Sequence, residues 1–299
     1  MRNDNSENSI IQLCLDKLSD SFGQKVVLQK KEHLGGGCIN NALRLCTSAG
    51  DFFLKWNLGC ESDMFIKEAA GLREMCAAEN EFLVIPIVIW AKESDDLPGF
   101  LLLEYLQPSV ATSNFDERLG RGLAVLHQKS VPEYGFHHDN YCGLTEQNNQ
   151  WDTSWIEFFG SRRIMYLVHL ISAKRGLSSS EMAIYEKLVD RLPIILSHQT
   201  KPSLIHGDLW AGNYMYTAKG PALIDPATYY ADREMEFSIM SMFGGFSPRV
   251  WSAYQEMYPL PDGWKERNHL YQLYHVLNHY YLFGGSYLSQ ANNIVRQFI

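Results

Sequence analysis

Short runs of alternating hydrophobic and polar residues fill the first third of the chain, and this pattern is typical of β-strands. Two segments in the same region instead repeat their hydrophobic residues at helical spacing, residues 10–18 and residues 64–75. Strands are predicted over residues 26–31, 42–45, 52–56, 82–90 and 100–106. We therefore expect the first third to fold as a sheet accompanied by two helices.

Beyond residue 106 the hydrophobic spacing becomes mainly helical. Helices are predicted over residues 119–127, 155–163, 182–196, 237–242 and 270–283. The segment Ser-Ser-Ser-Glu at 178–181 offers a cap for the third of these helices. No internal repeat or low-complexity linker interrupts the chain. The single predicted boundary lies near residue 106, between a part at 1–106 and a part at 107–299.

Two short hydrophobic segments in the helical region, Leu204–Ile205 and Ala222–Ile224, are predicted to be neighbouring strands with polar residues at their ends. Asp208 and Asn213 follow the first strand, and Asp225 ends the second. Either group alone, Asp208 with Asn213 or Asp225, could be explained as turn-forming residues on a simple hairpin. Protein kinases, however, use an Asp, an Asn and a second Asp in this order to transfer a phosphoryl group.

The chemistry of phosphoryl transfer assigns a role to each of these three residues. Mg²⁺ takes oxygen ligands, usually one or two protein carboxylates together with phosphate oxygens. Asn213 and Asp225 can supply such oxygens. We expect Asp208 to accept the proton of the hydroxyl group that attacks ATP, as the catalytic-loop aspartate does in protein kinases.

A run of glycines lies between two predicted strands and precedes a lysine on the next strand, Lys55. Glycines let backbone N–H groups approach phosphates without steric conflict, although a triple glycine alone is as typical of a hairpin turn. The combination with Lys55 favours a nucleotide site, and the absence of a following Lys-Ser/Thr excludes a Walker A loop. The candidate phosphate-binding residues of the loop are Gly35, Gly36, Gly37, Cys38, Ile39 and Asn40.

Two further elements complete the predicted nucleotide site. Glu68 lies beside the hydrophobic stripe of the helix at 64–75, so we expect it to pair with Lys55, and Glu61 is the other candidate. Glu104, Tyr105 and Leu106 end the last predicted strand before Pro108. In a two-lobed kinase the chain crosses between the lobes at such a point, and its backbone groups contact adenine there.

Composition and charge limit the class of protein. The chain has 299 residues, 46% of them hydrophobic and 20% charged, as is ordinary for a soluble globular protein. Its net charge of −8 argues against nucleic acid or an anionic membrane as a partner. The 6 cysteines lack metal-ligand spacing, and the polar start of the chain lacks the hydrophobic core of a signal peptide. We expect a cytoplasmic protein with reduced thiols.

The motifs HGDLWAGN, IDPA, YYADREME and MFGGF resemble those of the fructosamine kinase family, and the resemblance covers nearly the whole chain. Aminoglycoside and choline kinases share with it only the skeleton of HGD, Asn and Asp. Trp210 and the cluster Phe243–Phe246 narrow the match to the fructosamine kinase branch. Kinases for another small amine or alcohol, and a non-catalytic pseudokinase, are the alternatives.

The resemblance implies a fold, a reaction and a set of substrate contacts. The fold is α+β and kinase-like: a small lobe with an antiparallel sheet, a larger helical lobe, and ATP with Mg²⁺ between them. The family phosphorylates the 3-hydroxyl of ketosamines, fructosamines and ribulosamines, either free or on protein lysines, and the unstable product makes this a deglycation reaction. An indole face suits a sugar or an amine, so Trp210 is a candidate substrate contact. Asp232 and Glu234 are expected to contact the catalytic loop or a cationic substrate amine, unless they only favour a helix start.

Cys38 lies in the predicted phosphate loop, where a thiol beside backbone N–H groups can have a lowered pKa and be oxidised. We hypothesise a redox switch there, with a disulfide across a dimer as one form. The alternative is a small hydrophobic residue that fills the loop. The sequence leaves open a monomer or a homodimer.

Overall fold

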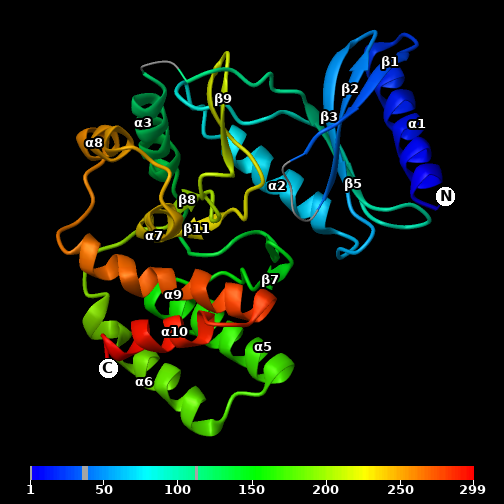
Figure 1. Ribbon diagram of the computed structural model, residues 1–299. Helices are drawn as coiled ribbons and strands as arrows, with labels where there is room; N and C mark the ends of the chain where they lie inside the picture. The colour runs from blue at the N-terminus through cyan, green and yellow to red at the C-terminus, as the bar shows by residue number, and fades with distance from the viewer. Residues whose placement is uncertain (1, 36–39, 112–113) are drawn as a thin grey trace.

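The computed structural model (Figure 1) describes residues 2–35, 40–111 and 114–299. Its first part contains one antiparallel sheet of five strands in the order β1-β2-β3-β5-β4. The strands are β1 (Leu28–His33), β2 (Asn41–Thr47), β3 (Gly50–Trp56), β4 (Val88–Lys92) and β5 (Phe100–Glu104). Helix α1 (Arg2–Phe22) precedes the sheet and helix α2 (Met64–Cys76) lies between β3 and β4 in sequence. We call these seven elements the sheet part.

The two helices cover opposite faces of the sheet, because side chains alternate between the faces along each strand. Phe100 and Leu102 of β5 belong to the hydrophobic cluster that includes α1, whereas Leu101 and Leu103 pack with α2. Lys55 of β3 pairs across the strands with Leu101. The alternation therefore directs Lys55 to the α2 face. In Figure 1, α2 lies between the sheet and the rest of the molecule, and α1 lies on the outer side.

The predicted strand over residues 82–90 is only partly correct. Strand β4 begins at Val88, and residues 82–87 do not join the sheet. Val84 instead donates its N–H to the carbonyl of Pro221 at 2.8 Å and accepts from the N–H of Leu223 at 3.0 Å. The second half of this hydrophobic run therefore belongs to the sheet, and its first half connects the sheet part to a strand of the second part.

The second part is mainly helical, and we call it the helical part. Its helices are α3 (Phe115–Gln128), α4 (Trp155–Glu157), the π-helix η1 (Phe158–Met165), α5 (Tyr166–Arg175), α6 (Ser179–Ile195), α7 (Glu234–Phe243), α8 (Pro248–Met257), α9 (Trp264–Phe283) and α10 (Tyr287–Arg296). Ser178 and Glu181 form a capping box at the start of α6, which confirms the predicted cap. Helices α8 and α10 were not predicted, and the predicted helix at 155–163 continues through η1 into α5.

Three small two-stranded sheets bring the polar ends of the short strands together. The pairs are β6 (Asn140–Cys142) with β7 (Thr145–Gln147), β9 (Tyr214–Thr217) with β10 (Gly220–Leu223), and β8 (Ser203–Ile205) with β11 (Tyr229–Ala231). The two predicted strands, now β8 and β10, do not pair with each other. Instead, Ile205 pairs with Tyr229. This register places the residues that follow β8 beside the residues that precede β11, and Asp225 is among the latter.

Candidate active site

The loop after β8 is closed on itself by hydrogen bonds that fix the relative positions of Asp208 and Asn213. The amide nitrogen of the Asn213 side chain donates to the backbone carbonyl of Asp208 at 2.8 Å and lies 3.3 Å from its carboxylate. Gly207 has a φ of 84°, and a Cβ there would lie 2.3 Å from the carbonyl oxygen of Ala227. Only glycine fits at this approach, so the loop packs directly against the segment that follows Asp225.

Lys55 links the two parts of the molecule through two carboxylates. Its Nζ lies 2.6 Å from a carboxylate oxygen of Glu68 and 2.7 Å from Oδ1 of Asp225. The alternative partner, Glu61, is exposed. Lys55 itself is 3% exposed. The structure thus brings Lys55, Glu68 and Asp225 together next to Asp208 and Asn213.

Asp225 has a left-handed backbone conformation, with a φ of 55°. For residues other than glycine this conformation costs about 1–2 kcal/mol, and Asp and Asn tolerate it better than most residues. The N–H of Ile224 donates to the carbonyl of Asn213 at 3.0 Å, and the N–H of Ala227 donates to the carbonyl of His206 at 2.9 Å. These bonds on both sides of Asp225 hold the strained residue in place.

The electrostatic surroundings shift the pKa values of Asp208, Asp225 and Lys55 in different ways. Burial raises the pKa of Asp208 to about 8, and the nearby carboxylates of Glu236 and Asp225 add to this rise. Desolvation by the surrounding protein would also raise the pKa of Asp225, but Lys55 outweighs this effect and lowers that pKa. Burial opposes the charge of Lys55, yet its two carboxylate partners raise its pKa above the usual value. Of the two aspartates, Asp208 is therefore the one suited to accept a proton near neutral pH.

The oxygen atoms of Asn213 and Asp225 fit a hard divalent cation. Asn213 donates from its amide nitrogen to Asp208, so its carbonyl oxygen is directed elsewhere. Oδ1 of Asp225 accepts a hydrogen bond from Lys55, and 52% of the Asp225 side chain is exposed. One carboxamide and one carboxylate oxygen match the set that Mg²⁺ uses when phosphate oxygens and water complete its shell.

Glu236 anchors the loop that carries Asp208, and this role was not predicted from the sequence. This fully buried residue of α7 accepts hydrogen bonds from the backbone N–H of His206 at 2.5 Å and of Gly207 at 3.1 Å. His206 in turn has Nε2 2.8 Å from the carbonyl oxygen of Ile224. The sequence contained one indication of this role, because two successive backbone N–H groups on a buried loop need a hydrogen-bond acceptor.

Asp232 and Glu234, the two predicted substrate contacts, lie in the interior. Asp232 is 2% exposed and bonds Nε2 of His198 at 2.8 Å and the hydroxyl of Tyr271 at 2.6 Å. Glu234 is 1% exposed and receives two hydrogen bonds from Arg267, at 2.9 and 2.6 Å. Their oxygens are used within the protein, so this placement does not fit contact with a substrate.

Trp210 presents its indole ring to solvent, with 43% of the residue exposed. The ring lies over Gly212, where a Cβ would come within 2.2 Å of it. The segment at 244–246 supports this loop from the side. A Cβ on Gly245 would meet Ala211 at 2.5 Å, and the hydroxyl of Tyr214 donates to the carbonyl of Gly245 at 3.2 Å. An exposed aromatic face thus lies two residues from Asp208.

The first predicted hinge residue, Glu104, ends β5, and Tyr105 and Leu106 follow it. The N–H of Glu104 donates to the carbonyl of Ile87 at 2.9 Å, and the carboxylate of Glu104 accepts from the N–H of Ile87 at 3.1 Å. Tyr105 donates its N–H to the carbonyl of Asp51 at 3.2 Å. The guanidinium of Arg44 lies over the Tyr105 ring, 4.5 Å from the ring centre. Leu106 is buried.

The glycine loop is described only at its ends. The N–H of Leu34 donates to the carbonyl of Ala42 at 3.0 Å, so the loop begins where the pairing of β1 and β2 ends. Asn40 accepts a side-chain hydrogen bond from Asn57 at 3.0 Å. The predictions for Gly36, Gly37, Cys38 and Ile39, including the redox switch, lie outside the described residues.

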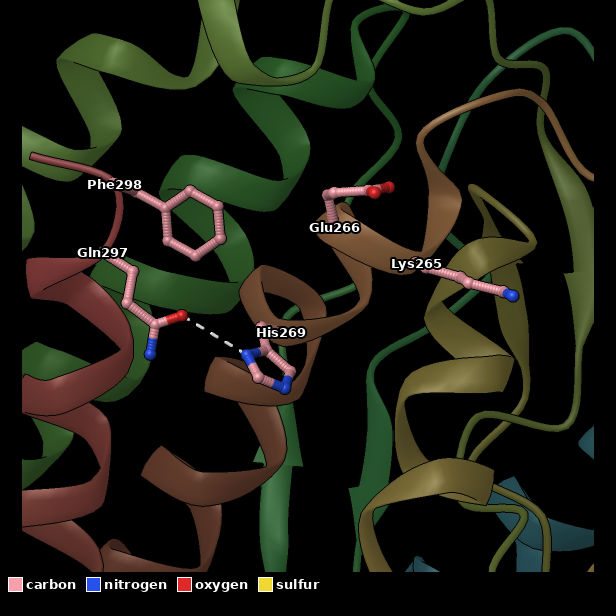
Figure 2. A pocket seen from close by; sticks show the side chains of 5 residues that line it. All are labelled: Lys265, Glu266, His269, Gln297 and Phe298. Atoms are coloured by element: carbon pink, nitrogen blue, oxygen red, sulfur yellow. Dashed lines mark hydrogen bonds between the residues drawn. The ribbon is translucent and has the colours of Figure 1, made fainter.

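A shallow pocket on the helical part is separate from this site (Figure 2). Lys265, Glu266 and His269 of α9 line it together with Gln297 and Phe298, which follow α10. Figure 2 shows the hydrogen bond between His269 and Gln297, which measures 3.3 Å. The pocket shares no residue with the cluster around Asp208, and it contains no arrangement suited to phosphoryl transfer.

Comparison with known proteins identifies the family of the chain. Residues 10–299 match the family model described as fructosamine kinase. This chain belongs to the fructosamine kinase family. A "Protein-ribulosamine 3-kinase, chloroplastic" of Oryza sativa subsp. indica is 37% identical over 273 residues, which cover 89% of this chain and 78% of that protein. A "Probable ketoamine kinase" of Synechocystis sp. is 34% identical over 288 residues, covering 96% of each chain.

Solved structures show the same architecture. A candidate fructosamine-3-kinase from Haemophilus somnus superimposes with a TM-score of 0.84 at 30% identity, covering 96% of each chain. An aminoglycoside phosphotransferase solved with ADP and hygromycin B has a TM-score of 0.63 at 15% identity, covering 94% of this chain and 97% of that one, and this likeness concerns the fold alone. The predicted kinase-like α+β fold of this fructosamine kinase family member is confirmed. Within the described residues, no helix combines the length and hydrophobicity needed to cross a membrane.

We predict that Asp208→Asn removes most turnover, by a factor of about 10²–10⁴, while ATP binding stays nearly intact. The same variant should be more stable than the wild type at pH 8. The unfolded carboxyl loses its proton near its ordinary pKa of 3.8, whereas the folded one keeps it up to about 8. Wild-type stability therefore falls as pH rises through this window.

Urea unfolding of the protein without nucleotide or metal, at pH 4 and pH 8, measures this difference. At pH 8 the variant should exceed the wild type by at least about 1 kcal/mol, and at pH 4 the two should agree more closely. A variant that turns over like the wild type, or one that gains no stability at pH 8, would contradict the environment described for Asp208.

A second prediction concerns the anchor of the loop. Glu236→Gln leaves at least one of the two backbone N–H groups without an acceptor, which costs about 1–3 kcal/mol in unfolding free energy. It should also lower kcat strongly, because the loop that carries Asp208 shifts. The matched control is Glu234→Gln on the same helix, which breaks the pair with Arg267 of α9 but touches no loop N–H. The control should lose stability and retain most of kcat, and equal losses of kcat in both variants would refute the anchoring role.

Proposed function

We propose that this chain transfers the terminal phosphoryl group of ATP to the 3-hydroxyl of a ketosamine, either a fructosamine or a ribulosamine. One observation supports the kinase chemistry most directly. Lys55 contacts Glu68 and Asp225 at 2.6 and 2.7 Å, and Asn213 contacts Asp208 on a neighbouring loop at 2.8 and 3.3 Å. The N–H of Ile224, which precedes Asp225, donates to the carbonyl of Asn213 at 3.0 Å and joins the two groups. A pseudokinase usually lacks at least one member of this set, so its presence favours an active enzyme.

We assign each of these residues a separate role in the reaction. Lys55, held by Glu68, is placed to bind ATP phosphates. Asn213 and Asp225 would hold Mg²⁺, which neutralises charge on the phosphates when bound. The substrate oxygen forms a bond to the terminal phosphorus as the bond from that phosphorus to ADP breaks. Asp208 receives the hydroxyl proton, and its raised pKa matches this task near neutral pH.

The kinase-like fold supports the predicted division at residue 106. In this proposal residues 1–106 form the small lobe and residues 107–299 the large lobe. The backbone of Glu104, Tyr105 and Leu106 contacts adenine, and the loop from Gly35 to Asn40 covers the phosphates. A cytoplasmic location and a monomer or homodimer remain predictions from the sequence.

The choice of a ketosamine rests on family membership and on Trp210. The relatives described above are named ribulosamine 3-kinase and ketoamine kinase, at 37% and 34% identity. An exposed indole can cover the apolar face of a sugar or attract a protonated amine. Asp232 and Glu234 are better suited to hold α7 against α9, because both are buried and bonded. A glycated lysine on a protein surface is compatible with an indole at the surface.

The substrate proposal is tested by ATP consumption with a fructosamine, a ribulosamine and an aminoglycoside in parallel. We expect turnover with at least one ketosamine and none above background with the aminoglycoside. Phosphorus NMR of the product should place the phosphate on the 3-hydroxyl, and slow breakdown of the product should release the amine. Turnover confined to the aminoglycoside would replace the proposed substrate class, and no ATP consumption with any substrate would indicate a pseudokinase.

Trp210→Ala tests the indole as a substrate contact. We expect KM for the ketosamine to rise about tenfold, which corresponds to about 1.4 kcal/mol, with KM for ATP unchanged. Trp210→Phe should recover part of the affinity because it retains an aromatic face. Phe22→Ala is the control, since Phe22 is an exposed aromatic residue of α1, 51% accessible. Unchanged ketosamine affinity in Trp210→Ala would remove the tryptophan from the substrate site.

A further inference from the structure

A cysteine and a histidine that the reaction does not use lie against the catalytic aspartate. Cys142 ends β6, His275 lies in the middle of α9, and Asp208 belongs to the loop after β8. The sulfur, one ring nitrogen and one carboxylate oxygen all lie within 4.8 Å of one another. Cys142 is 3% exposed and His275 is 2% exposed. Three potential ligands of different chemistry therefore converge in the interior at the edge of the site.

The surrounding hydrogen bonds hold the two new residues in place. The hydroxyl of Tyr274 donates to the side-chain oxygen of Gln147 on β7 at 2.7 Å. The side chain of Asn278 donates to the carbonyl of Cys142 at 3.2 Å. These bonds fasten α9 to the β6–β7 hairpin on both sides of His275. The relative position of Cys142 and His275 is therefore built into the fold.

The ligand set selects the metal. Thiolate and imidazole are ligands of Zn²⁺, whereas Mg²⁺ prefers oxygen alone. Zinc bonds of about 2.0–2.3 Å in tetrahedral geometry separate the ligand atoms by roughly 3.3–3.6 Å. Atoms already within 4.8 Å of one another reach that spacing through small side-chain adjustments. We propose that Cys142, His275 and Asp208 form an inhibitory zinc site with one coordination position left open.

A second grouping in the chain does not have this character. His198, Asp232 and Glu234 also lie within 4.8 Å of one another. Their carboxylates, however, already receive hydrogen bonds from Tyr271 and Arg267. A cation there would have to displace a guanidinium that is already paired. This grouping is an internal ion network and serves as a comparison for the proposed site.

Bound zinc would stop phosphoryl transfer by occupying the carboxylate of Asp208. The metal takes an oxygen lone pair that otherwise accepts the hydroxyl proton. This consequence rests on the proposed function, whereas zinc binding itself does not. The inhibitory site also differs from the candidate magnesium site, because Asn213 and Asp225 supply oxygens only. Zinc inhibition that depends on Cys142 would therefore be distinct from competition with magnesium.

Metal binding is tested first with the full-length protein in the absence of nucleotide and substrate. Cobalt(II) serves as the probe for zinc, since a cobalt–thiolate bond gives an intense near-ultraviolet absorption band. We expect the wild type to show this band with one equivalent of cobalt and to lose it when one equivalent of zinc is added. Cys142→Ser should lack the band, and Cys76→Ser, which changes an exposed cysteine, should retain it. A wild-type protein without the band overturns the site, whatever its kinase activity.

Inhibition is tested with a ketosamine at saturating Mg²⁺ and ATP, over a range of buffered free zinc. Cys142→Ser and His275→Gln should require at least about tenfold more zinc for half-inhibition, with activity in the absence of zinc largely retained. His279→Gln, one turn further along α9, and His198→Gln are the controls and should behave like the wild type. Equal zinc sensitivity in all variants would overturn the proposal and assign inhibition to the magnesium site or to ATP. If no ketosamine is phosphorylated, the proposed function fails, and the cobalt band still decides the metal site.

Discussion

A buried lysine shared by two carboxylates is the constraint on which the rest of the site depends. An ammonium group loses its hydration in the interior, and only close partners of opposite charge offset that cost. Glu68 and Asp225 provide these partners at 2.6 and 2.7 Å. Because one partner lies on α2 and the other follows β10, Lys55 fixes both the approach of α2 to the sheet and the approach of the sheet to the catalytic loop.

Hydrogen bonds to the backbone hold Asp208 and Asp225 in place at this charge cluster. Glu236 receives two successive N–H groups of the loop, and the close approach at Gly207 leaves no room for a side chain. Asp225 keeps a left-handed conformation between hydrogen bonds on both sides. These carboxylates are therefore positioned mainly by main-chain geometry. Loops of this kind place charged groups near one another at a cost that the surrounding fold offsets.

The sequence predicted the parts of the site whose signal is local. Lys55 alternates with hydrophobic residues on a strand, and Glu68 lies beside a helical hydrophobic stripe, so periodicity alone indicates which way each points. Asp208, Asn213 and Asp225 stand in a fixed order around two short strands. These signals sufficed for most of the sheet, for α2, and for the residues that meet at Lys55.

The remaining features depend on contacts between distant segments, which periodicity does not contain. Residues 82–90 read as one hydrophobic strand, although the first half pairs with β10. Glu234 and Glu236 are both acids at a helix start, and only packing decides that Glu234 meets Arg267 while Glu236 meets the loop. Similarly, Cys142 and His275 are 133 residues apart in the sequence, and nothing in the residues around either one indicates that they meet.

The hydrogen bonds of Val84 have a consequence for how the two parts are joined. Besides the chain crossing after β5, the segment before β4 is tied to β10 through the N–H and the carbonyl of Val84. At the end of α2, Glu74 also binds Tyr230 at 2.7 Å and Lys129 at 2.6 Å, both from the helical part. The two parts therefore meet along a seam of hydrogen bonds and ion pairs, and moving one part against the other means breaking several of these bonds together.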